Sequence, residues 1–199
     1  MSEETVHTDR ILTVPNALSL FRLLLIPLFL WLVLVRQADF AAAVVLAVSG
    51  VSDWADGVIA RRTGQVSRLG QVLDPLVDRL TIVATLLGLA LRDLVPWWFV
   101  GLLVLRELVL LGLVPVLRRH GLTALPVHYL GKAGTFALFW AFPLILAGSG
   151  TSALQHALSA IGWAFAFWGL GLYWYAAVLY LDQTRRIVAS GTMVGRPSP

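Results

Sequence analysis

Residues 17–35 read ALSLFRLLLIPLFLWLVLV, an apolar run that contains a single charged residue, Arg22. A helix needs about 20 mostly apolar residues to cross the hydrocarbon of a bilayer. Backbone groups in lipid must be satisfied within a helix or a closed barrel, and a run this long is not a strand. The stretch therefore predicts a membrane-spanning helix.

Further stretches of the same character extend this prediction to the whole chain. They cover residues 40–60, 75–91, 95–117, 131–147 and 153–181. Of the 199 residues, 58% are hydrophobic and 13% are charged, whereas soluble domains are roughly 45–50% apolar and about 25% charged. We expect an all-α integral membrane protein with about six transmembrane helices in one bundle. Residues 11–185 would form the membrane domain, between tails at 1–10 and 186–199.

The positively charged residues predict the orientation in the membrane. With six spans, both termini lie on the same side of the membrane. The short loops on the other side carry only Arg36 and Arg92. The loops and the C-terminal tail on the side of the termini carry Arg61, Arg62, Arg68, Arg118, Arg119, Lys132, Arg185, Arg186 and Arg196. Because basic loops stay in the cytoplasm, this bias places both termini in the cytoplasm and the protein in the cell membrane. A basic band at one membrane face meets anionic headgroups or substrates, which argues against a nucleic-acid partner.

Four aspartates lie in or beside the expected spans, where carboxylates are costly. Asp53 and Asp56 are three residues apart, and Asp74 and Asp78 are four apart, so each pair shares a helix face. The connection between the pairs is short, which brings all four together near the cytoplasmic boundary. An ionised aspartate at the membrane centre costs about 2.5–3.5 kcal/mol on insertion scales.

A divalent cation would offset both this cost and the mutual repulsion of the carboxylates. Hard carboxylate oxygens suit Mg²⁺, with Mn²⁺ as a substitute. The alternative is a purely structural network, in which the aspartates form ion pairs with Arg61, Arg62, Arg68 and Arg79.

The same segment forms a longer motif of eight residues at fixed spacing. Written out, it is Asp53-x2-Asp56-Gly57-x2-Ala60-Arg61-x8-Gly70-x3-Asp74-x3-Asp78. This motif resembles the signature of the CDP-alcohol phosphatidyltransferase family at every defined position. Pro15-Asn16, Leu18-Ser19, Arg22 and Pro27, with Arg106-Glu107, Gly131-Lys132 and Thr135, extend the likeness to actinobacterial phosphatidylglycerophosphate synthase and cardiolipin synthase members.

The resemblance implies an enzyme that depends on CDP-diacylglycerol, folded as a six-helix homodimer with its site open to the cytoplasm. It implies a site for two divalent ions, with Asp78 also serving as the general base. The metal ligands would be Asp53, Asp56, Asp74 and Asp78. The CDP-binding part would contain Gly57, Ala60, Arg61 and Gly70.

The residue types fit these roles, but each has a plainer alternative. Gly57 and Ala60 are small enough for a nucleotide to approach the backbone, yet small residues also pack helices together. Arg61 can hold a phosphate with two hydrogen bonds, or it can snorkel to the interface. Gly70 is expected to end or bend the turn between the two helices.

Three basic residues are candidates for the acceptor pocket: Arg106, Arg118 and Lys132. They would converge on an acceptor phosphate. Arg106 could instead pair with an acid on another helix, because adjacent residues such as Glu107 do not face each other on a helix. Arg118 could contact headgroups. For Arg22, contact with donor or acceptor and a plain interfacial role are both open.

The acceptor alcohol separates the remaining hypotheses. The first is transfer to glycerol 3-phosphate, giving phosphatidylglycerophosphate and CMP. The second is transfer to phosphatidylglycerol, giving cardiolipin, and inositol phosphate is a third acceptor. All three are anionic, so basic residues do not distinguish them. A cation transport protein is the alternative from a different class, but we find none of the internal repeats expected of a transporter.

Overall fold

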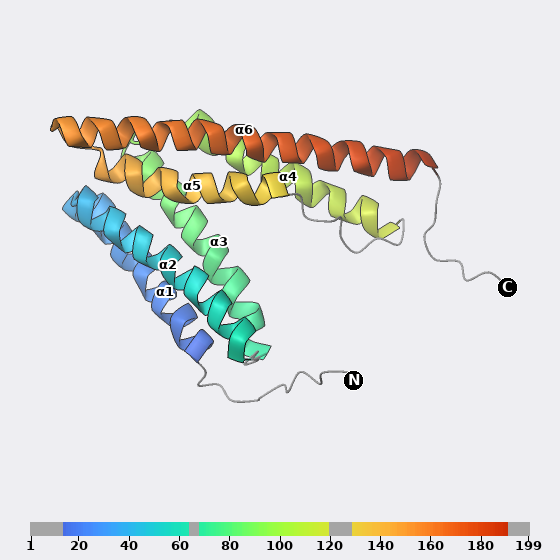
Figure 1. Ribbon diagram of the computed structural model, residues 1–199, viewed down its shortest axis with the longest axis horizontal. Coiled ribbons are helices and arrows are strands. Elements are labelled where there is room, and N and C mark those ends of the chain that lie inside the picture. Colours follow the sequence, from blue (N-terminus) through green and yellow to red (C-terminus); the bar gives the residue numbers. More distant parts are fainter. Residues whose placement is uncertain (1–13, 64–67, 120–128, 191–199) are drawn as a thin grey trace. The chain divides into compact units, whose positions relative to one another are not determined.

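The computed structural model describes residues 14–63, 68–119 and 129–190, and every regular element in these ranges is helical (Figure 1). In chain order the elements are α1 (Val14–Leu30), the π-helix η1 (Trp31–Arg36), α2 (Asp39–Thr63), α3 (Arg68–Leu91), α4 (Trp97–Arg119), α5 (Tyr129–Ala147) and α6 (Ala153–Ser190). The expected all-α fold is confirmed for the described part of the chain.

Four stretches in the described ranges are long and apolar enough to cross a membrane. They are Ala17–Arg36, Trp97–Pro115, Tyr129–Ala147 and Ala153–Arg186. They match the first, fourth, fifth and sixth spans expected from the sequence. With 25 and 24 residues, α2 and α3 are as long as the others. Neither is among the four stretches, and both carry several charged residues.

The helices around the aspartates are longer than the sequence suggested. We expected them to end near Ala60 and to begin again near Pro75. Instead α2 continues to Thr63 and α3 begins at Arg68. Gly70 therefore lies within the first turn of α3, and the prediction that it ends or bends the connection is wrong. Glycine costs a helix only about 1 kcal/mol relative to alanine, which the rest of α3 offsets.

The last helix, α6, is also longer than the expected span. It holds 38 residues and continues to Ser190, beyond the expected end at residue 181. At 1.5 Å per residue its length is about 57 Å.

The chain divides into two compact units. Unit 1 comprises residues 1–95 and 142–160, and unit 2 comprises residues 96–141 and 161–199. In unit 1, α1 packs against both α2 and α3 (Figure 1). The core side chains of these helices and of η1 include Leu25, Phe29, Val33, Ala42, Ala43, Leu46, Val77, Ala84, Leu86 and Leu89. Lipid tails are as apolar as leucine, so the fit of these side chains stabilises the unit more than removal from water does.

Arg92 and Asp39 form an ion pair in unit 1, near the connection between η1 and α2. Arg92 donates to Asp39 Oδ1 at 2.8 Å and to the backbone oxygen of Val33 at 2.7 Å. Ser149 donates to the other carboxylate oxygen of Asp39 at 2.6 Å. Gln37 turns the chain between the two helices in the left-handed conformation, with a φ of 51°.

In unit 2, α5 and α6 approach closely at a pair of glycines. A Cβ on Gly169 would lie 2.9 Å from Leu138 Cγ and 3.1 Å from the backbone oxygen of Gly134. A Cβ on Gly134 would lie 3.1 Å from the backbone nitrogen of Tyr173. Small residues at such positions let helix backbones approach, and this drives association inside lipid.

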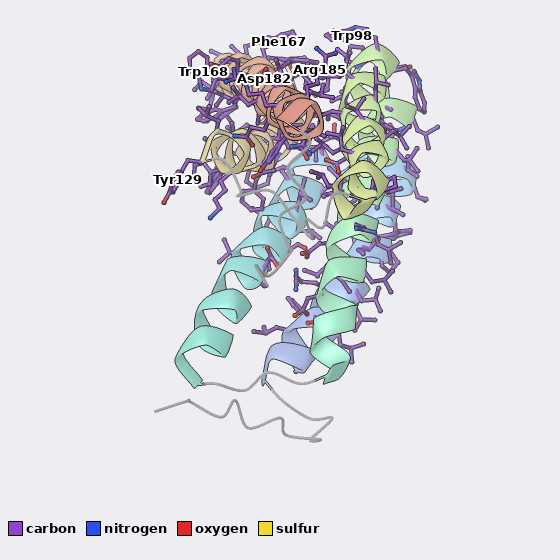
Figure 2. All side chains as sticks on the ribbon, turned by 90° about the vertical axis from the view of Figure 1, so that its right-hand side faces the viewer. Trp98, Tyr129, Phe167, Trp168, Asp182 and Arg185 are labelled. Carbon is purple, nitrogen blue, oxygen red and sulfur yellow. The ribbon has the colours of Figure 1, made fainter. Side chains whose placement is uncertain are left out.

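Aromatic side chains join α4 to α6 in the same unit. The rings of Trp98 and Phe167 stack at 6.4 Å between centroids, and Phe99 meets Trp163 edge to face at 5.9 Å. Trp98 and Trp163 therefore contribute packing contacts within unit 2. Tyr129 at the start of α5 is 86% exposed, and its side chain projects away from the neighbouring helices (Figure 2).

We expect Gly169→Ala to lower the free energy of unfolding by about 1–3 kcal/mol, because the added methyl overpacks the α5–α6 contact. Thermal unfolding of the purified protein in detergent measures the change. Gly171→Ala on the same helix is the control, since a Cβ there meets nothing within 4 Å. Equal stability of the two variants would show that the close approach is not a tight contact.

Candidate active site

Three helices of unit 1 contribute the residues of the candidate site. Ser19 and Arg22 come from α1, Asp53 comes from α2, and Asp74 and Asp78 come from α3. Each pair on one helix is three or four residues apart, so its members share a face. Because α1 packs against both other helices, its polar face meets the carboxylates of α2 and α3.

The guanidinium of Arg22 joins the carboxylates of different helices. Its Nη1 atom lies 2.5 Å from Asp53 Oδ1 and 2.6 Å from Asp78 Oδ1. Its Nη2 atom lies 3.8 Å from Asp74 Oδ1, which also accepts a hydrogen bond from the Ser19 hydroxyl. Of the sequence alternatives for Arg22, the plain interfacial role is wrong, because the residue is only 2% exposed.

The carboxylates are far more open than the arginine that joins them. The side chains of Asp53, Asp74 and Asp78 are 52%, 41% and 46% exposed. Their formal charge of −3 exceeds the +1 of Arg22, which leaves −2 on the described part of the cluster. A partly open cluster with net negative charge attracts cations.

The donor set also has the right chemistry for a divalent ion. Three carboxylates supply hard oxygens, and Asp53 and Asp78 already direct one oxygen each to a common point. No three acidic or imidazole groups among the described side chains surround one point as a finished metal centre. The Arg22 guanidinium occupies the position that the Asp53 and Asp78 oxygens both contact.

Of the four arginines named in the structural alternative for the aspartates, only Arg79 has a described side chain, and for Arg79 the alternative is wrong. Arg79 is exposed, and the carboxylates pair with Arg22 instead. Five expected site residues lie on the backbone of α2 or α3, but their side chains are outside the described ones: Asp56, Gly57, Ala60, Arg61 and Gly70. The same holds for the side chain of Arg118 on α4 and for the alternative partners Arg61, Arg62 and Arg68.

Arg106 lies in unit 2 and has its own set of partners. Its Nη1 atom lies 2.7 Å from Glu107 Oε1, and its guanidinium carbon lies 3.7 Å from the ring centroid of Tyr173. The Tyr173 hydroxyl donates to the same glutamate oxygen at 2.5 Å. The expectation that Arg106 and Glu107 do not meet is wrong: their Cβ atoms diverge, but both side chains are long enough to turn sideways toward each other.

One edge of the Arg106 guanidinium is left for another group. The residue is 8% exposed, and its Nε has no hydrogen-bond partner among the described residues. Lys132 is exposed, and its described contact is with the ring of Tyr129, 5.7 Å from the centroid. The described contacts of Arg106 and Lys132 thus involve different residues, and the expected convergence of the two stays a prediction.

Two residues of these clusters were given no role by sequence reasoning, although Ser19 was quoted as part of the family likeness. Ser19 lies three residues before the only charge in a 19-residue apolar run, and this spacing was a usable signal. Tyr173 gave no signal, because it is 66 residues from Glu107 and belongs to a helix rich in aromatic residues.

Known proteins are similar to this chain over nearly its whole length. A family model described as CDP-alcohol phosphatidyltransferase matches residues 12–168. A Streptomyces coelicolor protein named cardiolipin synthase (CMP-forming) is 50% identical over 193 residues, covering 94% of this chain and 90% of that protein. A Mycobacterium tuberculosis protein named putative cardiolipin synthase is 48% identical over 186 residues, covering 94% and 89%.

More distant relatives carry a different name. A Bacillus subtilis protein named CDP-diacylglycerol–glycerol-3-phosphate 3-phosphatidyltransferase is 33% identical over 146 residues, covering 66% of this chain and 75% of that protein. An Escherichia coli protein of the same name is 32% identical over 177 residues, covering 84% and 88%.

We expect Ser19→Ala to destabilise the protein by about 1.5–3 kcal/mol, because a fully buried hydroxyl would no longer donate to the Asp74 carboxylate. Thermal unfolding in detergent measures this loss. Ser52→Ala is the control and should change stability by less than about 0.5 kcal/mol. Its hydroxyl only bonds the Val48 carbonyl of its own helix. If Ser19→Ala left the free energy of unfolding unchanged, the hydrogen bond to Asp74 would not contribute to stability.

Proposed function

The chain belongs to the CDP-alcohol phosphatidyltransferase family, and we propose that it transfers the phosphatidyl group of CDP-diacylglycerol to the free hydroxyl of phosphatidylglycerol. The products would be cardiolipin and CMP. The gathering of Asp53, Asp74 and Asp78 around the Arg22 guanidinium supports the transfer chemistry. The acceptor rests on the comparisons.

The relatives fall into two groups by name, cardiolipin synthases and glycerol-3-phosphate phosphatidyltransferases. Their identities to this chain favour phosphatidylglycerol as the acceptor over glycerol 3-phosphate, which was the first hypothesis drawn from the sequence. Proteins named as cardiolipin synthases are 48–50% identical and cover 94% of the chain. Proteins named for glycerol 3-phosphate are 32–33% identical and cover 66–84%. Glycerol 3-phosphate is the second candidate, because a guanidinium edge such as that of Arg106 suits the phosphate of either acceptor.

We assign two divalent ions, Mg²⁺ or Mn²⁺, to Asp53, Asp56, Asp74 and Asp78. The oxygen donors, their exposure and the net charge of the described cluster support this assignment. When bound, the ions neutralise the donor pyrophosphate and the charge that develops on departing CMP. Mg²⁺ usually keeps part of its water shell, so a cluster that is about half exposed suits it.

Asp78 is the general base in this proposal. It accepts the proton of the acceptor hydroxyl as that oxygen forms a bond to the phosphorus of the phosphatidyl group. The bond from this phosphorus to the CMP oxygen breaks, and CMP leaves with the electron pair. Proton transfer requires the carboxylate to lie about 2.6–3.2 Å from the hydroxyl oxygen. Packing of α3 against α1 fixes the position of Asp78 and so contributes the orientation that this step needs.

The nucleotide would lie along the parts of α2 and α3 that continue from the aspartates. Gly57 and Ala60 follow Asp56 on α2, and Gly70 precedes Asp74 by one turn on α3. In these positions small residues allow close approach of the CDP, and Arg61 would bind a phosphate.

Arg106 is proposed to bind the acceptor phosphate, together with Arg118 and Lys132. Glu107 holds one end of its guanidinium and the Tyr173 ring covers one face, which leaves the Nε edge for an anion. A charge-assisted hydrogen bond at this edge would satisfy a buried donor that has no partner among the described residues.

The proposal includes a homodimer whose termini and active site face the cytoplasm. The orientation rests on the excess of basic residues in the loops on that side. It also includes membrane passage of α2 and α3, because their 25 and 24 residues exceed the roughly 20 that a span needs. Pairing of their aspartates with Arg22 and metal would lower the cost of that passage.

We expect purified protein in detergent with Mg²⁺ and labelled CDP-diacylglycerol to form cardiolipin and CMP when phosphatidylglycerol is supplied. A parallel reaction receives glycerol 3-phosphate, and chromatography identifies the lipid product. Asp53→Ala is the inactive control. If only the reaction with glycerol 3-phosphate gave a product, phosphatidylglycerophosphate, then glycerol 3-phosphate would be the acceptor. If neither reaction gave a product, the proposed activity would be wrong.

We expect Asp78→Asn to lower kcat by about 10²–10⁴-fold, because the amide cannot accept the hydroxyl proton. The same labelled assay measures turnover, and gel filtration shows that the variant stays folded. Asp93→Asn is the matched control, since Asp93 is exposed at φ 54°, a conformation that asparagine also adopts. Activity at the level of the unaltered protein in Asp78→Asn would rule out this residue as the base.

A further inference from the structure

We infer that Arg22 is a displaceable internal cation: its guanidinium takes the place of a divalent ion between Asp53 and Asp78, and metal binds by displacing it. This inference rests on the proposed metal site and adds a residue of α1 to its operation. Arg22 lies outside the aspartate motif, 31 residues before its first member.

The first argument is geometric. A single nitrogen, Nη1 of Arg22, lies 2.5 Å from Asp53 Oδ1 on α2 and 2.6 Å from Asp78 Oδ1 on α3. A cation that bridges the two helices would occupy the same point. Mg²⁺ needs oxygen ligands at about 2.0–2.1 Å, so both oxygens would have to turn from the guanidinium toward the ion.

The second argument is electrostatic. A guanidinium and a divalent ion held by the same oxygens repel each other strongly at a separation of a few ångströms. The described cluster carries −3 from its carboxylates and +1 from Arg22, so its attraction for a metal ion is lower than that of the carboxylates alone. The two cations therefore exclude each other at this point, and the guanidinium weakens metal binding.

The third argument concerns where the guanidinium goes. Arg22 is 2% exposed, so it does not turn freely into water when an ion arrives. A displaced buried cation needs another anion, and the pyrophosphate of the donor supplies one beside the same carboxylates. Metal and donor then favour each other's binding, and by linkage the effect is reciprocal.

Arg22 also offsets the mutual repulsion of the carboxylates. Asp53, Asp74 and Asp78 all lie around its guanidinium, and their negative charges would otherwise repel one another. Removing the guanidinium should therefore weaken the metal-free protein while making the vacated point a better metal site.

The test measures binding of Mn²⁺ to metal-free protein in detergent, followed by the paramagnetic resonance signal of the free ion, with no donor present. We expect Arg22→Gln to bind Mn²⁺ about tenfold more tightly than the unaltered protein, because the competing charge-assisted contacts are gone. Arg92→Gln is the matched control and should leave the affinity unchanged, since Arg92 pairs with Asp39 at the other end of α3.

Two further measurements test the inference even if Arg22→Gln folds poorly. Arg22→Lys keeps a positive charge at this position and should bind Mn²⁺ within about threefold of the unaltered protein. In the unaltered protein, CDP-diacylglycerol should tighten Mn²⁺ binding by about tenfold, because the donor accepts the displaced guanidinium.

The outcomes separate this inference from the proposed function. Saturable Mn²⁺ binding that is equal or weaker in Arg22→Gln would overturn the inference and leave the metal site in place. An absence of saturable binding in every protein would overturn both. Tighter binding in Arg22→Gln, with Arg22→Lys and Arg92→Gln close to the unaltered protein, would establish the exchange of the two cations.

Discussion

A buried guanidinium in a membrane protein must be matched by nearby anions, and in unit 1 this requirement connects three helices. Arg22 on α1 meets Asp53 of α2 and Asp78 of α3, while Ser19 on the same face of α1 holds Asp74. Arg22 is only 2% exposed, so loss of the carboxylates around it would leave a buried charge uncompensated, which is costly. The residues proposed for catalysis are therefore also residues that hold the helices in register.

The sequence predicted the helical fold and, for the described side chains of Asp53, Asp74 and Asp78, their gathering, because both follow from spacing along the chain. Apolar runs indicate membrane helices by length, and carboxylates three or four residues apart share a face on any helix. The partner of the aspartates was not predictable in this way. The arginines close to them in sequence were the obvious candidates, whereas Arg22 comes from another helix and the choice depends on how the three helices pack.

Other differences between the sequence predictions and the structure also arise from features that spacing along the chain does not describe. The ion pair between Arg106 and Glu107 was missed because spacing describes where Cβ atoms point, not how far long side chains extend. Tyr173 was missed because its contact with Glu107 joins residues far apart in the chain. The ends of α2 and α3 were misplaced because charged residues and Gly70 mark the end of an apolar run, although the helical backbone continues through them.

The two buried arginines differ in what they leave for a ligand. Arg22 belongs to a described cluster with a net charge of −2, which favours cations. Arg106 and Glu107 together are neutral, and the guanidinium keeps an unsatisfied Nε among the described residues, which favours an anion. A reaction between an anionic nucleotide donor and an anionic acceptor needs both kinds of site, one that collects metal ions and one that binds phosphate directly.

The length of α6 has a consequence for how the protein fits its bilayer. Its apolar stretch Ala153–Arg186 holds 34 residues, or about 51 Å of helix, against a hydrocarbon thickness of about 30 Å. Tilts of transmembrane helices reach only about 40° from the membrane normal, which takes up less than half of the excess length. Part of α6 must therefore extend into the headgroup layer or beyond. A helix that already exceeds the bilayer can slide or tilt as the membrane thickens or thins without exposing unsatisfied backbone groups to lipid.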